Sequence, residues 1–292
     1  MKTMMKRLIA GTLAAAAVAA LSGCSGGVQD PKHLLVAHGH GEWHPVNIGL
    51  TTFAEAVEEK TDYTFSVYPN GQLGDDSAMV QLVKAGVLDV AKVSAGALEQ
   101  FNPAYSIFSV PYVFQSTEHY FNTMNNSEAA QEIFNSTRDD GFIAIGWFDS
   151  GARSIYTTKE GPVESPKDLN GLKIRTMNSP TSVEMINNMG GSATPMSSGE
   201  VYTSLQQGIL DGAENNETVL VDDGHGEVCK SYTYTQHQYL PDIVIMSIET
   251  YDSMTEEDRQ VVYDAMKEAW QAHEDEWLQV VERNKEGAKE MG

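Results

Sequence analysis

Cysteines, basic residues and long apolar runs are all scarce in this sequence. Lysine and arginine together number 19 against 41 aspartates and glutamates, which gives the 292-residue chain a formal net charge of −22. Such an acidic surface repels nucleic acid and anionic lipid headgroups, so we expect no nucleic-acid partner. It also repels an anionic solute, unless a local positive site overrides the general field. With 41% hydrophobic residues, the chain is long enough for one or two domains.

The longest apolar run lies at the N-terminus. Residues 8–21 follow the cationic start MKTMMKR and consist almost entirely of small apolar residues and leucine. This pattern predicts an export signal that is too short to span a bilayer. No other stretch stays apolar for the 18 residues of a membrane-spanning helix, so we expect no transmembrane helix.

The sequence contains only two cysteines, and the first follows the apolar run directly. Cys24 ends the sequence LSGC, which resembles the bacterial lipobox, whose cysteine is acylated and becomes the first residue of the mature chain. We therefore expect a lipoprotein signal peptide over 1–23, a lipid anchor at Cys24 and a flexible tether over 24–32. The alternative is a plain secretory signal with a chance cysteine. Acylation leaves Cys229 without an intramolecular disulfide partner, and we expect its thiol to be packed.

Beyond the tether, predicted strands and helices alternate. Strands separated by helices of this length predict βαβ units and largely parallel sheets. The strands are expected at 34–38, 63–69, 88–94, 141–148, 150–157, 172–176, around Ala193, at 211–215, around Tyr232 and at 242–249. The helices are expected at 47–60, 76–84, around Glu118, around Ala129, at 181–188 and at 199–207. A long amphipathic helix follows Thr255, which with Asp258 three residues later is typical of a capped helix start.

Two arginines stand in apolar strands. Three others have acidic neighbours in the sequence and are expected to be solvated: Arg138, Arg259 and Arg283. Arg153 in SGARSIYT and Arg175 in LKIRT have few acids nearby. A buried guanidinium needs a carboxylate partner. Either the protein supplies that partner, for example Glu184 or Glu200, or a ligand does.

The loop HGHGEWH concentrates His38, His40, Glu42 and His44. Imidazole and carboxylate groups suit zinc, so a metal site is one interpretation of this loop. A solvated loop without a ligand is another, particularly for His40 and His44.

Several long stretches together resemble one family. They are YPNGQLGDDSAMVQLVKAG, NPAYSIFSVPYVF, SPKDLNGLKIRTMNSPTS and TPMSSGEVYTSLQQGILDGAENN, the last covering 194–216. In this order they resemble the DctP-type extracytoplasmic solute-binding proteins of TRAP transporters, from Leu34 to the tail helix. Members of that family usually continue beyond the point that corresponds to Gly292, so a chain truncated at its C-terminus is one interpretation.

The resemblance implies a two-lobe α/β fold of the periplasmic-binding-protein type. Its sheets are mixed and largely parallel, and a long C-terminal helix spans both lobes. Lobe I is expected over 33–150 with parts of 238–270, and lobe II over 151–237 with parts of 271–292. The cleft between them closes on an organic acid, which is delivered to a sodium-coupled membrane permease.

The resemblance also implies site residues. The family's carboxylate-binding arginine in the GLKIR motif maps to Arg175, and a second arginine in the preceding strand maps to Arg153. The asparagine of the DGAEN motif maps to Asn215, and the alignment brings Ser198 to the ligand. His237, isolated in the sequence, is a further candidate for the cleft.

Hydroxyl groups of the ligand need further polar partners. Asp76 and Ser94 are candidates. A helix N-cap is an equally good explanation for Asp76, and a turn at the strand end is the alternative for Ser94. The resemblance places the HGHGEWH loop at the cleft mouth, where His38 and Glu42 would bind hydroxyls and Trp43 would cover a sugar ring.

Acids near the ligand decide the expected ligand class. They repel a second carboxylate but accept hydrogen bonds from hydroxyls, which favours a polyhydroxy monocarboxylate. GARSIYTTKE and GAENNE also resemble family members that bind glucuronate or galacturonate. The alternatives are a C4-dicarboxylate, sialic acid, or a zinc-binding lipoprotein.

No enzyme is expected. The sequence lacks G-x-S-x-G, a phosphate-binding G-x-x-x-x-G-K-[ST] loop and H-E-x-x-H. We expect no cofactor and a monomeric protein, exported and lipid-anchored at the outer face of the cell membrane.

Overall fold

The computed structural model describes residues 32–292. The predicted signal peptide, Cys24 and all of the tether except Lys32 lie outside the described residues. Leu34–Gly292 forms one unit. No helix in residues 32–292 is both long and apolar enough to cross a bilayer.

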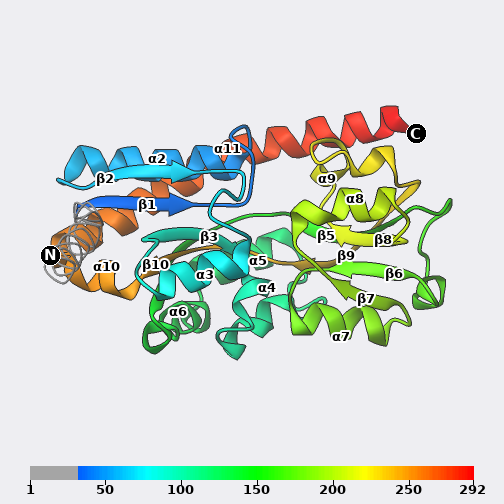
Figure 1. Cartoon of the computed structure of the whole chain (residues 1–292), viewed down its shortest axis with the longest axis horizontal. Coiled ribbons are helices and arrows are strands. Elements are labelled where there is room, and N and C mark those ends of the chain that lie inside the picture. Colours follow the sequence, from blue (N-terminus) through cyan, green and yellow to red (C-terminus); the bar gives the residue numbers. More distant parts are fainter. Residues whose placement is uncertain (1–31) are drawn as a thin grey trace, which may run out of the picture. The chain divides into compact units, whose positions relative to one another are not determined.

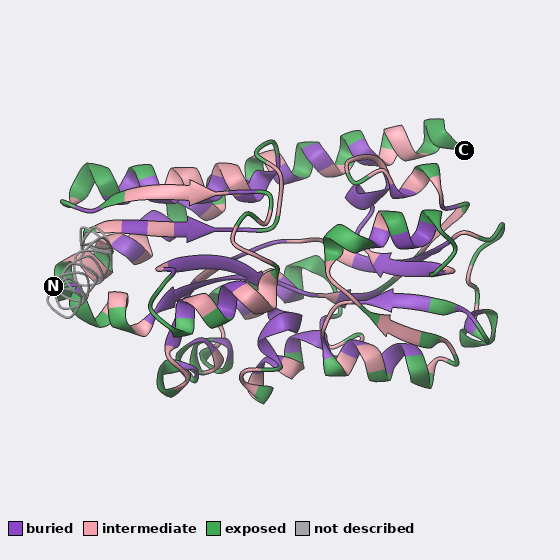
Figure 2. Cartoon of the chain, viewed as in Figure 1, coloured by how far each residue is buried: buried purple, intermediate pink, exposed green. Residues whose placement is uncertain are grey.

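The first sheet has the strand order β2-β1-β3-β10-β4 (Figure 1). Its strands are β1 (His33–Ala37), β2 (Thr64–Tyr68), β3 (Val90–Ser94), β4 (Phe142–Phe148) and β10 (Asp242–Ser247). Its helices are α2 (Pro45–Lys60), α3 (Asp76–Lys84), α4 (Ala95–Leu98), η1 (Pro103–Ser109), α5 (Thr117–Asn126), α6 (Glu128–Asn135), η2 (Arg138–Asp140) and α10 (Ile248–Ser253). Every residue of β3 and β10 is buried, because apolar clusters cover both faces of the sheet (Figure 2).

The second sheet has the order β7-β6-β8-β5-β9. Its strands are β5 (Ala152–Thr157), β6 (Lys173–Thr176), β7 (Ser192–Pro195), β8 (Gly212–Asn215) and β9 (Ser231–Tyr239). Its helices are η3 (Pro166–Leu169), α7 (Pro180–Asn188), η4 (Ser198–Glu200), α8 (Val201–Gln206), α9 (Thr218–Val221) and η5 (His225–Glu227). Two smaller apolar clusters form its core.

The predicted two-lobe architecture is confirmed. The chain passes from the first sheet to the second after Phe148 and returns after Tyr239. Both sheets are mixed: β1 pairs in parallel with β3, and β6 in parallel with β7 and β8. The antiparallel pairings all involve β5 or β10, the first strand after each crossing. The exact lobe boundaries remain predictions.

The predicted tail helix is α11 (Glu256–Met291), which has 36 residues and is about 54 Å long. The Thr255 side chain accepts from the Asp258 N–H at 3.1 Å, and the Asp258 carboxylate accepts from Thr255 in return, which confirms the predicted cap. The helix packs against α2 and β4 of the first lobe and against α9 and η5 of the second. It therefore spans and contacts both lobes (Figure 1).

Most predicted elements agree with the structure to within two residues. α2 begins earlier than predicted, at Pro45, because the His44 ring caps the helix by accepting from the Val46 N–H at 3.2 Å. The last predicted strand ends at Ser247 instead of residue 249, because α10 begins at Ile248. The helix predicted at 199–207 is divided between η4 and α8.

One buried acid of α11 lies near the crossing between the lobes. An oxygen of Glu274, Oε2, is buried and has no hydrogen-bond partner among the described residues. Burial, followed by repulsion from Asp149 and Asp275, raises the pKa of Glu274 from 4.5 to about 7. Burial likewise raises the pKa of Asp149 to about 6. The folded state therefore favours protonated carboxyls at this point.

We predict that Glu274→Gln stabilises the protein at pH 8 but not at pH 4.5. The folded-state pKa of Glu274 exceeds its unfolded value, so its stabilising contribution is complete below pH 4.5 and is lost as the pH rises through 7. The neutral amide avoids that loss, which should raise the free energy of unfolding at pH 8 by at least about 1 kcal/mol, since one pKa unit corresponds to about 1.4 kcal/mol. Urea unfolding at both pH values measures the effect. Glu132→Gln on the exposed face of α6 is the matched control; a gain there of equal size would contradict the assignment.

Candidate functional site

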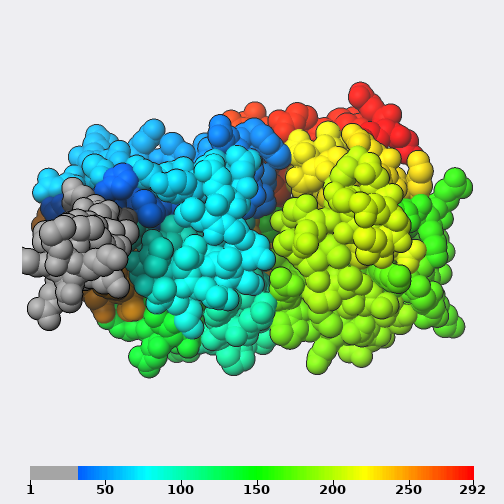
Figure 3. All heavy atoms as spheres, in the orientation of Figure 1, coloured from blue at the N-terminus to red at the C-terminus, as the bar shows by residue number. Residues whose placement is uncertain are grey.

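A pocket of about 450 Å³ is lined by residues from both lobes. The first lobe contributes the loop after β1, the start of α3 and the polar ends of β3 and β10. The second contributes β5, β6, β8 and the segments around η4 and α9. In the space-filling view, the segment containing α3 faces the segment containing η4 and α8 along a seam (Figure 3). A neighbouring hollow of about 320 Å³ shares Asp76, Arg175 and Ser198 with this pocket.

Arg175 lies in this pocket without a carboxylate partner. It is 4% exposed in the apolar strand β6, and its Nε and Nη2 both donate to the Met196 carbonyl, at 3.1 and 2.8 Å. A guanidinium has five N–H donors, so two are used and three are left. Within residues 32–292 no ion pair forms between Arg175 and an acid, including Glu184 and Glu200. Burial lowers the pKa of Arg175, so its charge is one that a ligand carboxylate would stabilise.

Arg153 also lines the pocket, but the protein supplies its partner. Its Nε donates to Glu214 Oε2 at 2.5 Å, and its Nη2 to Oε1 at 3.0 Å and to the Glu214 carbonyl at 2.7 Å. A fourth N–H goes to Asn215 Oδ1 at 2.9 Å, which leaves one free. Burial opposes ionisation of Glu214, but Arg153 and His237 outweigh it and lower the pKa of Glu214 to about 2. The internal pairing considered for Arg153 is therefore present, with Glu214 as partner in place of Glu184 or Glu200.

Lys92 is a third buried cation of the pocket, and our sequence analysis missed it. Its Nζ lies 2.9 Å from Asp242 Oδ2 and 2.8 Å from His40 Nε2. Burial disfavours the Asp242 carboxylate, but Lys92 and His40 outweigh it and hold the pKa of Asp242 well below its usual range. A lysine within the apolar run LDVAKVS was the available signal, the same one that drew attention to the two arginines.

Asp76 and Ser94 lie side by side on the pocket wall. Asp76 is the first residue of α3, and its Oδ2 accepts from the Ser94 N–H at 2.9 Å. The N-cap considered for Asp76 is its neighbour Asp75, whose side chain accepts from the Ala78 N–H. Burial raises the pKa of Asp76, and Lys92 opposes the rise. Ser94 caps α4 where β3 ends, because its Oγ accepts from the Gly96 N–H, and Ser94 also lines the pocket.

Asn215 and Ser198 also line the pocket. Asn215 Oδ1 is held by Arg153, while Ser198 is exposed in η4. The structure therefore brings together six of the nine candidate residues: Arg175, Arg153, Asn215, Asp76, Ser94 and Ser198.

Three candidates do not reach the pocket. The His38 ring is fully buried, with Nε2 3.1 Å from Asn47 Oδ1, and Glu42 is exposed outside the pocket. His237 is also fully buried, and its Nε2 lies 3.7 Å from Glu214 Oε2. Other residues of the HGHGEWH loop line the pocket instead: His40, Trp43 and His44.

The described residues do not gather the histidines into a metal site. The His40 and His44 rings stack at 3.9 Å, while His38 faces Asn47. No group of three His, Cys, Asp or Glu side chains within residues 32–292 is arranged to hold a metal ion.

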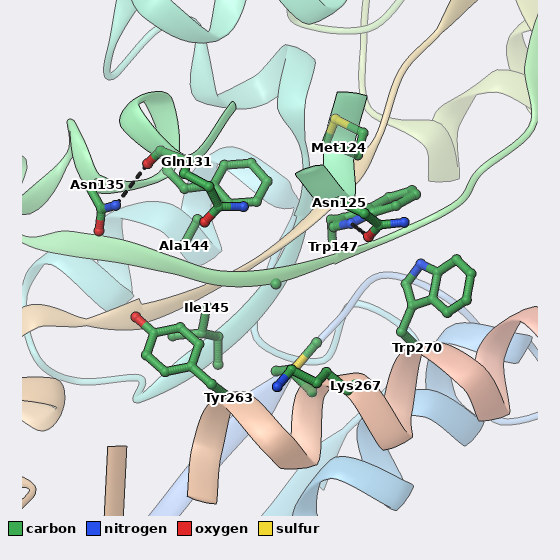
Figure 4. Close-up of a pocket in the computed structure, with 13 residues that line it drawn as sticks. Met124, Asn125, Gln131, Asn135, Ala144, Ile145, Trp147, Tyr263, Lys267 and Trp270 are labelled. Carbon is green, nitrogen blue, oxygen red and sulfur yellow. Dashed lines mark hydrogen bonds between the residues drawn. The ribbon is translucent and has the colours of Figure 1, made fainter. Parts of the chain in front are cut away.

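A second hollow, of about 460 Å³, lies on the first lobe between α6, β4 and α11 (Figure 4). Trp147, Trp270 and Tyr263 line it together with the amides of Asn125 and Gln131. Lys267 is the one charged side chain among its lining residues, and it pairs with Asp264 at 2.7 Å. Because no unpaired cation lines this hollow, the pocket that contains Arg175 is the better site for an anion.

Comparison with known proteins agrees with this geometry. The family described as "Bacterial extracellular solute-binding protein, family 7" matches residues 36–292. A TRAP periplasmic solute-binding protein of Anaerococcus prevotii with bound glucuronate is 46% identical, with a TM-score of 0.86 over 89% of this chain and 85% of its own. The chain belongs to the TRAP transporter solute-binding proteins.

Two further solute-binding proteins are similar to this chain. A TRAP solute-binding protein of Sulfitobacter with bound galacturonate is 33% identical, with a TM-score of 0.84 over 89% of this chain and 87% of its own. A solute-binding protein of Chromohalobacter salexigens is 36% identical over 255 residues, which are 87% of this chain and 75% of that protein. The TRAP solute-binding family is an extracytoplasmic transport family and not an enzyme family.

We predict opposite effects of the two pocket arginines on the stability of the ligand-free TRAP protein. Arg153→Met leaves Glu214 buried without its cation, which should cost about 3 to 5 kcal/mol. Arg175→Met removes a buried charge that has no carboxylate partner, and should leave the stability unchanged or raise it. Denaturant unfolding without ligand compares them. A loss of several kcal/mol on Arg175→Met would show that an internal group satisfies this guanidinium.

Proposed function

We propose that this protein binds a hexuronate, glucuronate or galacturonate, in the pocket and delivers it to a sodium-coupled TRAP permease. The observation that carries the proposal is the Arg175 guanidinium, which is buried, faces the pocket and retains three unused N–H donors. A planar guanidinium matches a carboxylate through two parallel hydrogen bonds. Arg175 therefore binds the carboxylate of the sugar acid.

The rest of the pocket suits hydroxyl groups. Asp76 and Ser94 line it and present oxygen atoms that accept hydrogen bonds from hydroxyls. Asn215 Oδ1 already accepts from Arg153 and from the Asn216 N–H, so Asn215 offers its amide Nδ2 as a donor to a hydroxyl oxygen. A second carboxylate on the ligand would meet Arg153 and Lys92, whose charges Glu214 and Asp242 already neutralise. Charge and hydrogen bonding together favour one carboxylate and several hydroxyls. Trp43 is half exposed beside the pocket, where it can cover a sugar ring.

The ligands of related proteins support this class. TRAP solute-binding proteins at 28 to 46% identity contain glucuronate, galacturonate or erythronate. All three are polyhydroxy monocarboxylates. A C4-dicarboxylate or sialic acid remains the alternative ligand.

Isothermal titration calorimetry of the ligand-free protein tests the ligand. We expect glucuronate or galacturonate to bind more tightly than succinate, malate and sialic acid. Arg175→Ala should weaken uronate binding by about 3 kcal/mol or more, because two charge-assisted hydrogen bonds are lost. Arg175→Lys should recover only part, because an ammonium lacks the forked geometry. Tight succinate binding without response to either uronate would refute the proposal.

We propose further that the protein is held at the membrane through acylated Cys24. LSGC directly after the apolar run supports this, and residues 24–32 would serve as the tether. The protein should fractionate with membranes in the producing cell, and Cys24→Ser should release it or block its processing. Cys229→Ser, at the buried cysteine, is the matched control and should leave fractionation unchanged. A soluble wild-type protein in which Cys24 is unacylated or has been removed with the signal peptide would rule out the anchor.

A further inference from the structure

Three buried cations line the pocket, and two of them are paired with buried carboxylates. Arg153 pairs with Glu214 and Lys92 with Asp242, whereas Arg175 has no acid partner within residues 32–292. Lys92 is 3% exposed and Asp242 6%, so water screens their pair weakly.

The Lys92–Asp242 pair belongs to the opposite lobe from Arg175. Lys92 stands on β3 and Asp242 on the neighbouring strand β10, while Arg175 stands on β6 of the second sheet. A ligand held by Arg175 therefore meets the Lys92–Asp242 pair from across the pocket. Lys92 uses two of its three N–H donors, on Asp242 and His40, and one is left.

We propose that Asp242 determines specificity by neutralising Lys92. The inference rests on the proposed function, since it concerns what the pocket accepts beyond the carboxylate on Arg175. The neutral pair can donate one hydrogen bond to a hydroxyl but provides no net charge for a second carboxylate. Asp76, beside the same wall, adds repulsion. The pocket therefore selects a sugar monocarboxylate and rejects the corresponding sugar dicarboxylate.

Glucarate is the suitable probe, because it has a carboxylate at both ends of the hexuronate carbon skeleton. Three variants change the charge of the Lys92–Asp242 pair without enlarging either side chain. Asp242→Asn leaves the pair with a charge of +1, the double variant Lys92→Gln with Asp242→Asn leaves it neutral, and Lys92→Gln leaves it with −1. Each ligand is compared with itself across the series, so differences in shape between glucuronate and glucarate cancel.

The affinities for glucuronate and glucarate, measured by calorimetry, should follow the charge of the Lys92–Asp242 pair. Asp242→Asn should bind glucarate at least about tenfold more tightly than the wild type does, because an unpaired cation in a poorly screened pocket attracts the second carboxylate. The neutral double variant should return to the wild-type preference. Lys92→Gln should weaken glucarate more than glucuronate.

Thermal unfolding shows which variants are folded. If Asp242→Asn fails to fold, Lys92→Gln tests the same claim from the opposite sign of charge: an unchanged ratio of the two affinities would overturn the inference. Equal glucarate affinity in Asp242→Asn and in the double variant would also overturn it. A wild-type protein that binds glucarate as tightly as glucuronate refutes the role of Asp242 but leaves sugar-acid binding standing. Binding of neither ligand refutes the proposed function and the inference with it.

Discussion

Burial of positive charge is the constraint on which the binding site depends. The protein carries 41 acids against 19 basic residues, yet it buries three cations around one pocket. Each buried charge loses its hydration and needs a counter-charge to recover that free energy. Glu214 and Asp242 supply it for Arg153 and Lys92, while Arg175 has only a backbone carbonyl. In the function that we propose, the positive site that overrides the general negative field is therefore the single guanidinium of Arg175.

The strand pairing in the two mixed sheets brings the buried cations next to their carboxylates. β5 lies beside β8, which brings Arg153 to Glu214, and β10 lies beside β3, which brings Asp242 to Lys92. Both strands follow a crossing between the lobes, so each ion pair stands next to a segment that links them. The pairs hold the polar ends of these strands in place. Arg175, on the parallel strand β6, donates to the Met196 carbonyl, and we propose that its remaining donors bind the ligand.

Much of this arrangement could be predicted from the sequence. Hydrophobic periodicity located the ten strands and the longer helices but missed the short helices α4, α9 and α10. An arginine in the apolar run LKIRT indicated an anion site. The counter-charges could not be predicted, because they depend on strand register across long separations. Arg153 and Glu214 are 61 residues apart, and Lys92 and Asp242 are 150 apart. The two candidates from the HGHGEWH loop, His38 and Glu42, do not line the pocket. β1 ends at Ala37 and His38 turns into the core, so His40 lines the pocket instead.

A crystal structure with bound glucuronate would test the central claim most directly. The account predicts the carboxylate of the sugar acid within hydrogen-bond distance of Arg175, with the Arg153–Glu214 and Lys92–Asp242 pairs intact. The hydroxyls should contact Asp76, Ser94 or Asn215. A carboxylate bound instead to Arg153 or Lys92, with Glu214 or Asp242 displaced from its cation, would contradict it.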